Sequence, residues 1–295
     1  MPRLRLATRG SPLALAQAEL VAAALGGAEI VPVRGEGPAP NDKARFVRGV
    51  EAALLAEEAD LGVHSAKDLP AEQADGLELV GVPPRENPAD AYVGPAGSVE
   101  EVEAGARIGT SSLRRRAQLL ALREDLETVE LRGNVDTRLG KLAAGECDGA
   151  VLALAGLRRL GRDGEVKFAF GTEQMTPAAG QGALAMQART GDEEAAAAAA
   201  QLTDRAALVE LTAERTAVGA LEATCNTPIG IHASLTTGEL VVSGFAGLAD
   251  GSEWVRDQVA GDPDQPGALG QALAERMLSA GAREILGRAE EATAA

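Results

Sequence analysis

Hydrophobic residues recur at two different spacings in the first 85 residues of the chain. Short apolar runs bounded by polar residues predict strands, and longer stretches with apolar residues every three or four positions predict helices. The expected elements are, in order, strand Leu4–Thr8, helix Pro12–Leu25, strand Ala28–Val33, helix Lys43–Glu58, strand Leu61–Val63 and strand Leu77–Val82. Strands that alternate with helices in this way predict a parallel β-sheet.

A stretch with three prolines in six residues, Pro83–Pro88, interrupts this pattern and predicts a first domain boundary. The alternation then resumes with strand Arg107–Gly109, helix Ser112–Arg123, strand Thr128–Leu131, helix Asn134–Ala144 and strand Gly149–Leu154. A second breaker-rich stretch, residues 176–182, precedes a short apolar run at Leu184–Gln187. We expect the chain to return to the first sheet there, so that two crossings form a hinge with a cleft between two lobes.

The pattern changes again after residue 190. It predicts helices at Asp192–Gln201 and 204–221, strands at His232–Thr236, Glu239–Gly247 and Glu253–Val259, and a last helix at Pro266–Ala280. Turn signals between the three strands indicate an antiparallel sheet. The predicted fold class is therefore α/β: two lobes like those of periplasmic binding proteins, with mixed and mostly parallel sheets, plus a C-terminal α+β domain with a three-stranded antiparallel sheet. The expected domains are residues 1–85 with 178–202, residues 86–177, and residues 203–295.

Charge narrows the possible partners. The net charge of −16 argues against a nucleic-acid-binding surface, which needs clustered positive charge. Only four of the 28 basic residues are Lys, against 44 acidic residues. An acid excess with little Lys suits a cytoplasm of high salt, where charge repulsion is screened, and we treat this as a hypothesis.

Compartment and metal content follow from a few residue types. Cys147 and Cys225 form no disulfide framework in a chain of 295 residues, which favours a reducing compartment. The N-terminus lacks the apolar core of a secretory signal, and no stretch reaches the length of a membrane span. The two His and two Cys do not have metal-ligand spacing. We therefore expect a cytoplasmic protein with no metal, no membrane partner and no nucleic-acid partner.

Chemically active side chains follow the buried strand at Leu61–Val63. His64, Ser65, Lys67 and Asp68 stand between this strand and Pro70, which ends regular structure. In an open α/β sheet, ligands bind at the carboxyl ends of the strands. The alternative is an ordinary strand exit in which Lys67 and Asp68 pair in solvent.

Three further strand ends share one design, in which polar side chains cap a helix and arginines stand beside the cap. They are Thr8–Ser11, Thr110–Arg116 and Arg132–Arg138. Helix N-termini bind anions, and Arg adds a bidentate fork for carboxylate or phosphate. So many arginines around one cleft predict a large polyanionic ligand, although some of them, such as Arg116, can simply neutralise an acid-rich surface. No phosphate loop or dinucleotide fingerprint is present.

Cys225 lies in a loop between a predicted helix and a predicted strand. Loops position reactive groups, whereas Cys147 adjoins an apolar run and is expected to be buried and inert. A single loop cysteine is more often structural, so its position alone leaves both roles open.

Seven segments of the chain resemble the porphobilinogen deaminase family, also called hydroxymethylbilane synthases. They occur in the family's order and are Ala7–Leu15, Val63–Pro70, Gly109–Arg115, Leu131–Val135, Ala155–Leu157, Pro177–Gly182 and Cys225–Gly230. The resemblance implies a three-domain transferase of porphyrin biosynthesis. It would condense four porphobilinogen molecules head to tail into 1-hydroxymethylbilane, releasing four ammonia molecules, on a dipyrromethane primer bound covalently to Cys225.

The resemblance also implies roles for individual residues, because every pyrrole carries an acetate and a propionate. Asp68 matches the family's catalytic carboxylate. The residues expected to bind the cofactor are Cys225, Lys67, Ser65, Arg114, Arg115, Arg132, Thr110, Ser111, Ser112 and Asp68. The residues expected to bind substrate are Arg9, Ser11, Gln17, Arg138, Arg159 and Lys43. A monomer is expected, and His64 becomes a structural residue.

Two features depart from the family's pattern. The loop at residues 34–43 is shorter than the family's lid, and Asp136 stands where the family commonly has Gly, close in sequence to Arg132 and Arg138. The competing prediction is a non-catalytic, two-lobed protein that binds a carboxylated solute. A covalent adduct on Cys225 distinguishes the two, because only the enzyme requires it.

Overall fold

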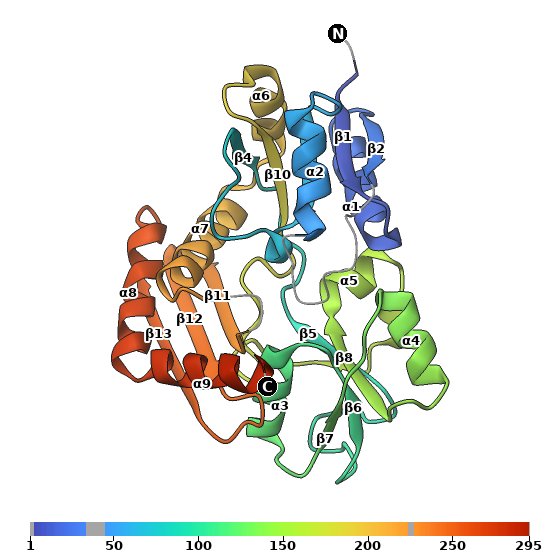
Figure 1. Cartoon of the computed structure of the whole chain (residues 1–295), viewed down its shortest axis with the longest axis vertical. Helices are drawn as coiled ribbons and strands as arrows, with labels where there is room; N and C mark the ends of the chain where they lie inside the picture. The colour runs from blue at the N-terminus through green and yellow to red at the C-terminus, as the bar shows by residue number, and fades with distance from the viewer. Residues whose placement is uncertain (1–2, 34–44, 224–226, 295) are drawn as a thin grey trace.

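The computed structural model describes residues 3–33, 45–223 and 227–294. Three β-sheets, each covered by helices, lie around a common centre (Figure 1). Lys43 and Cys225, two of the predicted site residues, lie outside the described residues, as does most of the shortened loop.

The first sheet has the strand order β2-β1-β3-β10-β4, with β2, β1 and β3 parallel and β10 antiparallel to both β3 and β4. Its strands are β1 (Arg5–Arg9), β2 (Glu29–Val33), β3 (Leu61–Ser65), β4 (Leu77–Gly81) and β10 (Leu184–Arg189). Successive residues of β1 point to opposite faces. Leu6 packs with α1 (Pro12–Ala24) and α6 (Glu193–Leu202), whereas Ala7 packs with α2 (Arg45–Leu55) on the other face.

The second sheet repeats this plan with the strand order β7-β6-β8-β5-β9. Its strands are β5 (Asp90–Val93), β6 (Arg107–Gly109), β7 (Glu127–Val129), β8 (Gly149–Ala153) and β9 (Phe168–Ala169). Helix α3 (Leu113–Leu122) packs on one face against Ile108 and Val151. Helices α4 (Val135–Ala143) and α5 (Leu154–Arg159) pack on the other face against Leu152. A 3₁₀ turn at Asp163–Glu165 follows.

The third sheet is an antiparallel meander, as the sequence pattern predicts. Its strands are β11 (Ile229–Thr236), β12 (Glu239–Gly247) and β13 (Trp254–Gly261). Thr237 and Gly238 both have positive φ, which gives the tight two-residue turn expected between β11 and β12. Helices α7 (Arg205–Ala220), α8 (Pro266–Ser279) and α9 (Ala282–Ala294) share an apolar core with this sheet.

Two crossing segments join the lobes, and they lie against each other. The backbone N–H of Glu86, in the first crossing, donates to the carbonyl of Gly182 in the second, at 3.2 Å. Gly182 has a φ of +87°, and a Cβ there would lie 2.2 Å from the Glu86 carbonyl oxygen. A side chain at this position would force the crossings apart. The predicted return to the first sheet is confirmed, because β10 pairs with β3 and β4.

The sequence pattern does not predict four of the observed elements: β5, β9, α5 and α9. Strand β5 has only four residues and begins with the acidic Asp90, although that residue is wholly buried. Strand β9 has two residues, and α5 begins directly after β8 without a breaker residue between them. The second sheet is mixed, as predicted, and both of its antiparallel pairings involve β5, a strand that the sequence pattern missed.

Candidate active site

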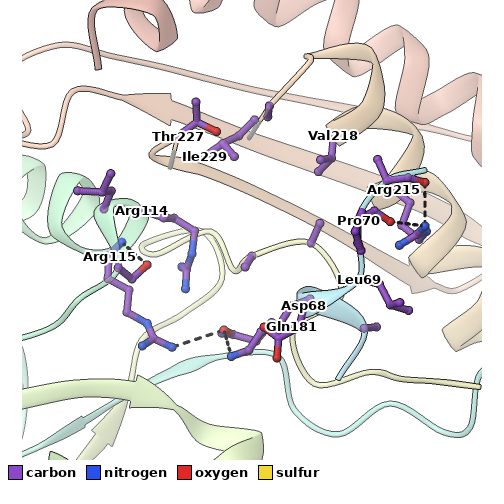
Figure 2. Close-up of a pocket in the computed structure, with 18 of the residues that line it drawn as sticks. Asp68, Leu69, Pro70, Arg114, Arg115, Gln181, Arg215, Val218, Thr227 and Ile229 are labelled. Carbon is purple, nitrogen blue, oxygen red and sulfur yellow. Dashed lines mark hydrogen bonds between the residues drawn. The ribbon is translucent and has the colours of Figure 1, made fainter. Parts of the chain in front are cut away.

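A cavity of about 390 Å³ lies where the three sheets meet. Its walls come from the segment after β3, the start of α3, α4, the second crossing, α7 and the start of β11 (Figure 2). Cavities of roughly 300–1,000 Å³ are typical of small-molecule sites. A smaller cavity of about 70 Å³ adjoins the first sheet. Lys67 and Asp68 line both cavities, so they stand between the two spaces.

Asp68 is positioned by the end of β3. The strand is buried up to His64, and a single 3₁₀ turn, Ala66–Asp68, follows Ser65. The N–H of Ala66 donates to the carbonyl of Ala183 at 3.0 Å, which fixes this turn against the second crossing. The prediction that these polar side chains stand at a strand's carboxyl end is confirmed.

His64 points into the protein and is held by one partner. Its Nε2 lies 3.1 Å from Oε1 of Gln187 on β10. Burial lowers the pKa of His64 to about 4, so the imidazole is neutral near pH 7. A buried, neutral, hydrogen-bonded histidine agrees with the structural role expected for it.

Lys67 is a half-buried cation. Its Nζ lies 3.4 Å from Oε1 of Gln181, which is held between Gly180 and Gly182 in the second crossing. Burial, with a smaller contribution from the charge of Arg115, lowers the pKa of Lys67 to about 8. Burial disfavours the charged form of Lys67, and a nearby negative charge favours it. A carboxylate of a bound ligand would therefore stabilise the charged ammonium.

Arg114 and Arg115 share one buried carboxylate, Asp90. Arg114 donates from Nη1 to Oδ2 of Asp90 at 2.6 Å, and Arg115 donates from Nε to Oδ1 at 2.9 Å. Both arginines are only 5% exposed. Burial would raise the pKa of Asp90, but the two guanidinium groups reverse this effect and hold it well below its usual range. Both arginines line the cavity as predicted, and part of their charge is already neutralised.

The polar residues before α3 form its cap. The hydroxyl of Ser112 accepts from the N–H of Arg115 at 3.4 Å, and that of Thr110 accepts from the N–H of Ser112 at 3.2 Å. Ser111 donates from Oγ to the carbonyl of Leu131 at 2.5 Å. Ser111 and Ser112 line the cavity, whereas Thr110 braces the cap beneath them.

Arg138 reaches the same cavity from α4. Its Nε is buried and has no hydrogen-bond partner among the described residues. Burial, and to a lesser degree the charge of Arg115, lowers the pKa of Arg138 to about 10. A buried donor without a partner costs free energy, so Arg138 is poised to take an anionic ligand.

The smaller cavity brings together the remaining predicted residues of the first lobe. Arg9, Ser11, Gln17 and Ser65 line it together with Lys67 and Asp68. The hydroxyl of Ser11 caps α1 by accepting from the N–H of Ala14 at 3.3 Å. The first predicted arginine cap therefore faces the same aspartate as the second, although the two caps belong to different sheets.

Besides Thr110, two predicted residues among the described ones line neither cavity. Arg132 pairs at the surface with Glu130, at 2.6 Å, and Arg159 donates from Nη2 to the carbonyl of Gly182 at 2.7 Å. Asp136 pairs with Arg162, at 2.6 Å, and not with Arg132 or Arg138. Although Asp136 is close in sequence to those two arginines, its carboxylate is therefore directed to a different one.

Three residues at the cavity were not singled out from the sequence: Asp90, Gln181 and Arg215. Asp90 lies in the strand that the pattern missed. Gln181 could have been found from the sequence, because a glycine stands on each side of it. Both glycines have positive φ, and a Cβ on Gly180 would lie 2.7 Å from the backbone of Ala66. Arg215 lies on α7, where helical periodicity alone gives no reason to distinguish it from other exposed arginines.

A buried ion pair joins the crossings to the C-terminal domain. Arg85, in the first crossing, pairs with Glu214 of α7 at 2.8 Å. The Glu214 carboxylate also accepts from the backbone N–H groups of Gly180, at 2.6 Å, and Ala233, at 2.8 Å. Burial would raise the pKa of Glu214, but the charges and hydrogen bonds of Arg85 and His232 together outweigh it, so the pKa is lowered. The wall that carries Gln181 is thereby fixed to α7.

The part of the chain that the structure describes offers neither a membrane span nor a cluster of metal ligands. No helix there is both long and apolar enough to cross a membrane. No group of three or more His, Cys, Asp or Glu side chains is arranged to hold a metal ion in that part of the chain.

Comparison with known proteins places the chain. Residues 4–197 match the sequence model described as porphobilinogen deaminase, dipyromethane cofactor binding domain, and residues 208–279 match the C-terminal domain of the same enzyme. The chain is 41% identical to the porphobilinogen deaminase of Syntrophus aciditrophicus strain SB, over 98% of this chain and 99% of the relative.

Likeness to solved structures is distant. YhfZ from Shigella flexneri is 15% identical over 76% of this chain and 99% of its own, with a TM-score of 0.35. A Salmonella typhimurium periplasmic binding protein with high arginine specificity is 11% identical over 68% of this chain and 93% of its own, with a TM-score of 0.39. The two matches to the enzyme's own domains and the close relative settle the assignment: the chain belongs to the porphobilinogen deaminase family.

Proposed function

We propose that Asp68 is the catalytic carboxylate with which this chain condenses four porphobilinogen molecules into 1-hydroxymethylbilane. The family assignment makes the chain a transferase of porphyrin biosynthesis (EC 2.5.1.61) with a dipyrromethane-binding domain. The observation that carries the role of Asp68 is its place in the walls of both cavities. A group there can contact a substrate on one side and the primer on the other.

The residues of the larger cavity fit a dipyrromethane. Two pyrroles bring four carboxylates, and Lys67, Arg114 and Arg115 supply positive charge against the single buried carboxylate of Asp90. Cys225 itself lies outside the described residues, but Ala223 and Thr227, two positions away on either side, line the cavity. When bound, the group supplies the nucleophilic pyrrole carbon on which the chain starts. We assign its carboxylates to Lys67, Arg114, Arg115 and Arg132, with hydrogen bonds from Ser65, Thr110, Ser111 and Ser112.

Substrate binding is assigned to the smaller cavity and its rim. Arg9, Ser11 and Gln17 line that space, and Arg138 faces Asp68 from the second lobe. Arginine pairs with the substrate's acetate or propionate in a bidentate way, which fixes the orientation of the ring. Lys43 and Arg159 complete the proposed set by motif match alone.

The chemistry of Asp68 follows from the charge that the reaction creates. The C–N bond of the substrate's aminomethyl group breaks, ammonia leaves with the bonding electrons, and a methylene-pyrrole cation remains. Asp68 stabilises this cation and accepts the pyrrole N–H. A carbon–carbon bond then forms between the methylene carbon and a carbon of the neighbouring, nucleophilic pyrrole, and this nucleophilic ring loses one proton. Asp68 is the nearest base at the junction of the cavities to accept that proton. After four such steps, release would require cleavage of the carbon–carbon bond between the primer and the methylene of the first-added unit, with a proton returned to the primer's pyrrole carbon. Water then adds to that freed methylene carbon and gives the hydroxymethyl group.

Intact-mass spectrometry tests the covalent part of the proposal. The purified protein should carry one addition of two pyrrole units, and Cys225→Ser should abolish it. An unmodified wild-type mass would instead favour the non-catalytic carboxylate-binding protein.

Asp68→Asn tests the catalytic part. The variant should fold and keep the adduct, but turnover should fall about 10²–10³-fold, as when one preorganised electrostatic group is lost. Asp75→Asn is the matched control, because Asp75 is an exposed carboxylate seven residues further on that lines neither cavity. Near-normal turnover of Asp68→Asn would refute the assignment.

Three further predictions concern the domain bounds, the oligomeric state with the compartment, and the effect of salt. The domain bounds 1–85 with 178–202, 86–177 and 203–295 are supported by the sheet memberships, in particular by the pairing of β10 with β3. The chain is proposed to act as a monomer in the cytoplasm. The high-salt hypothesis predicts that molar salt raises the free energy of unfolding, and no gain would rule it out.

A further inference from the structure

Arg215 reaches the larger cavity from the C-terminal domain. Its Nη2 donates to the carbonyls of Pro70, at 2.7 Å, and Ala71, at 2.9 Å, just beyond the catalytic turn. Figure 2 shows Arg215 on the opposite side of Asp68 from Arg114 and Arg115. The cavity therefore has a positive end that no predicted site residue accounts for.

The charge of Arg215 is not neutralised within the described part of the chain. No acidic side chain there forms an ion pair with it, whereas Glu214, its neighbour in sequence, is paired with Arg85. Burial lowers the pKa of Arg215, and no nearby acid counteracts this effect. A partly desolvated cation whose contacts are two backbone carbonyls is favourable in a wall that receives an anion.

The wall beside Arg215 suits the face of a pyrrole ring. Leu69 and Val218 contribute apolar surface to the cavity there. A ring with acetate and propionate groups needs both an apolar face and a cation, and this end of the cavity offers the two together. Arg138, another cation of the cavity without an acidic partner among the described residues, is on the second lobe and serves a different carboxylate.

The proposed reaction gives a reason for a cation at this place. Each condensation adds one ring with two carboxylates, while Asp68 stays fixed on its turn. The added rings must therefore occupy space away from Asp68, and the far end of the cavity is bounded by Arg215.

We propose that Arg215 binds a carboxylate of the pyrrole chain as it grows, in the part of the cavity lined by Leu69, Pro70 and Val218. This role rests on the proposed function and adds a binding residue to it. The hydrogen bonds to Pro70 and Ala71 hold the guanidinium in place until the chain reaches it.

A mass-spectrometric titration tests the proposal. Wild type, Arg215→Gln, Arg215→Lys and Arg256→Gln are each mixed with one to four equivalents of porphobilinogen, and the masses are followed over time. Arg256 is the matched control because its guanidinium also ties the C-terminal domain to backbone carbonyls, including that of Gln174 at 3.2 Å, but lies outside both cavities.

All four proteins should carry the primer and take up the first unit at similar rates. In Arg215→Gln, species with two or three added units should persist about ten- to a hundredfold longer than in wild type, the loss expected for one charged hydrogen bond. Arg215→Lys should relieve this accumulation because it keeps the charge.

The proposal is overturned by three results: an unchanged distribution in Arg215→Gln, an equal slowing of all additions, or no relief in Arg215→Lys. A lowered melting temperature in Arg215→Gln and Arg256→Gln alike, with normal distributions, would also overturn it, because it would show only a structural tie. A wild-type protein without the primer would refute the proposed function itself.

Discussion

The cavity contains two kinds of guanidinium group. Arg114 and Arg115 are buried at the start of α3 and both donate to Asp90. Arg138 and Arg215, on α4 and α7, line the same space without an acidic partner among the described residues. Arg114 and Arg115 are paired with a carboxylate before any ligand binds, whereas Arg138 and Arg215 remain able to bind a carboxylate of the ligand.

This difference distinguishes arginines that stabilise the fold from arginines that contact the ligand. A buried arginine that is already paired stabilises the fold and adds a positive field, but its best donors are taken. An arginine whose donors lack a carboxylate gains most when a ligand supplies one. The predictions below test this division, from the largest expected effect to the smallest.

Replacing Asp90 should give the largest change in stability. Asp90→Asn leaves two buried guanidinium groups without their shared carboxylate, and we expect a loss of about 3–5 kcal/mol in the free energy of unfolding. Denaturant unfolding of the primer-free Cys225→Ser protein measures it. Asp148→Asn, which removes the exposed partner of Arg107, is the control and should cause a much smaller loss. A similar loss in both variants would contradict the scaffold role.

The pH dependence of Asp90 has a definite sign. Its pKa is held below the unfolded value, so its contribution to stability is present above about pH 4 and is lost as pH falls towards the folded pKa. The wild-type protein should lose more stability on acidification than Asp90→Asn does.

Arg138 and Arg114 should respond in opposite ways to the same substitution. Arg138→Leu removes an unpartnered buried donor, so the primer-free protein should change by less than about 1 kcal/mol, whereas uptake of the first porphobilinogen should fall about ten- to a hundredfold. Arg114→Leu should destabilise the primer-free protein clearly more, because it leaves Asp90 with one guanidinium. Unfolding curves measure the stability of both variants, and mass spectrometry of quenched samples measures their uptake of porphobilinogen. Equal destabilisation by the two substitutions would contradict the distinction between the paired and the unpaired arginines.

Lys67 should titrate well below an ordinary lysine in the primer-free protein. Burial lowers its pKa from 10.5 to about 8, so charging it costs stability below pH 8, and the cost is relieved as pH rises from 8 towards 10.5, where the unfolded chain still binds the proton. Reductive methylation with ¹³C-formaldehyde, followed by NMR, reads its midpoint, and Lys67→Arg identifies the signal. A midpoint near 10.5 would contradict the buried environment.

The exposed pair of Arg132 and Glu130 should give the smallest effect. Exposed ion pairs contribute about 0.2–1 kcal/mol, so Arg132→Gln should leave the primer-free protein's stability nearly unchanged. Such a weak pair costs little to break, which leaves Arg132 available to the primer as the family motif implies. If a smaller fraction of the Arg132→Gln protein carries the covalent primer, this role is supported. If all of the protein carries the primer, the role is ruled out.

Much of the site could be predicted from the sequence because its residues stand at fixed places in local structure. A strand followed by Ser65–Asp68, and hydroxyl caps followed by arginines, have signatures within a few residues. Asp90 and Arg215 have no such signature. Asp90 resembles a surface acid until β5 is placed between β8 and β9 inside a sheet, and Arg215 resembles any exposed helix arginine until α7 is packed beside Pro70.

The sequence by itself determined the alternation of strands and helices, the antiparallel C-terminal sheet and the hydroxyl and basic side chains that stand at strand ends near Asp68. These depend on periodicity, capping and turn chemistry, which act over short stretches of chain. Only the tertiary structure decided which arginines are neutralised and which are left for a ligand. That outcome depends on burial and on partners far away in sequence, such as Asp90 for Arg114 and Glu214 for Arg85, and no local pattern encodes them.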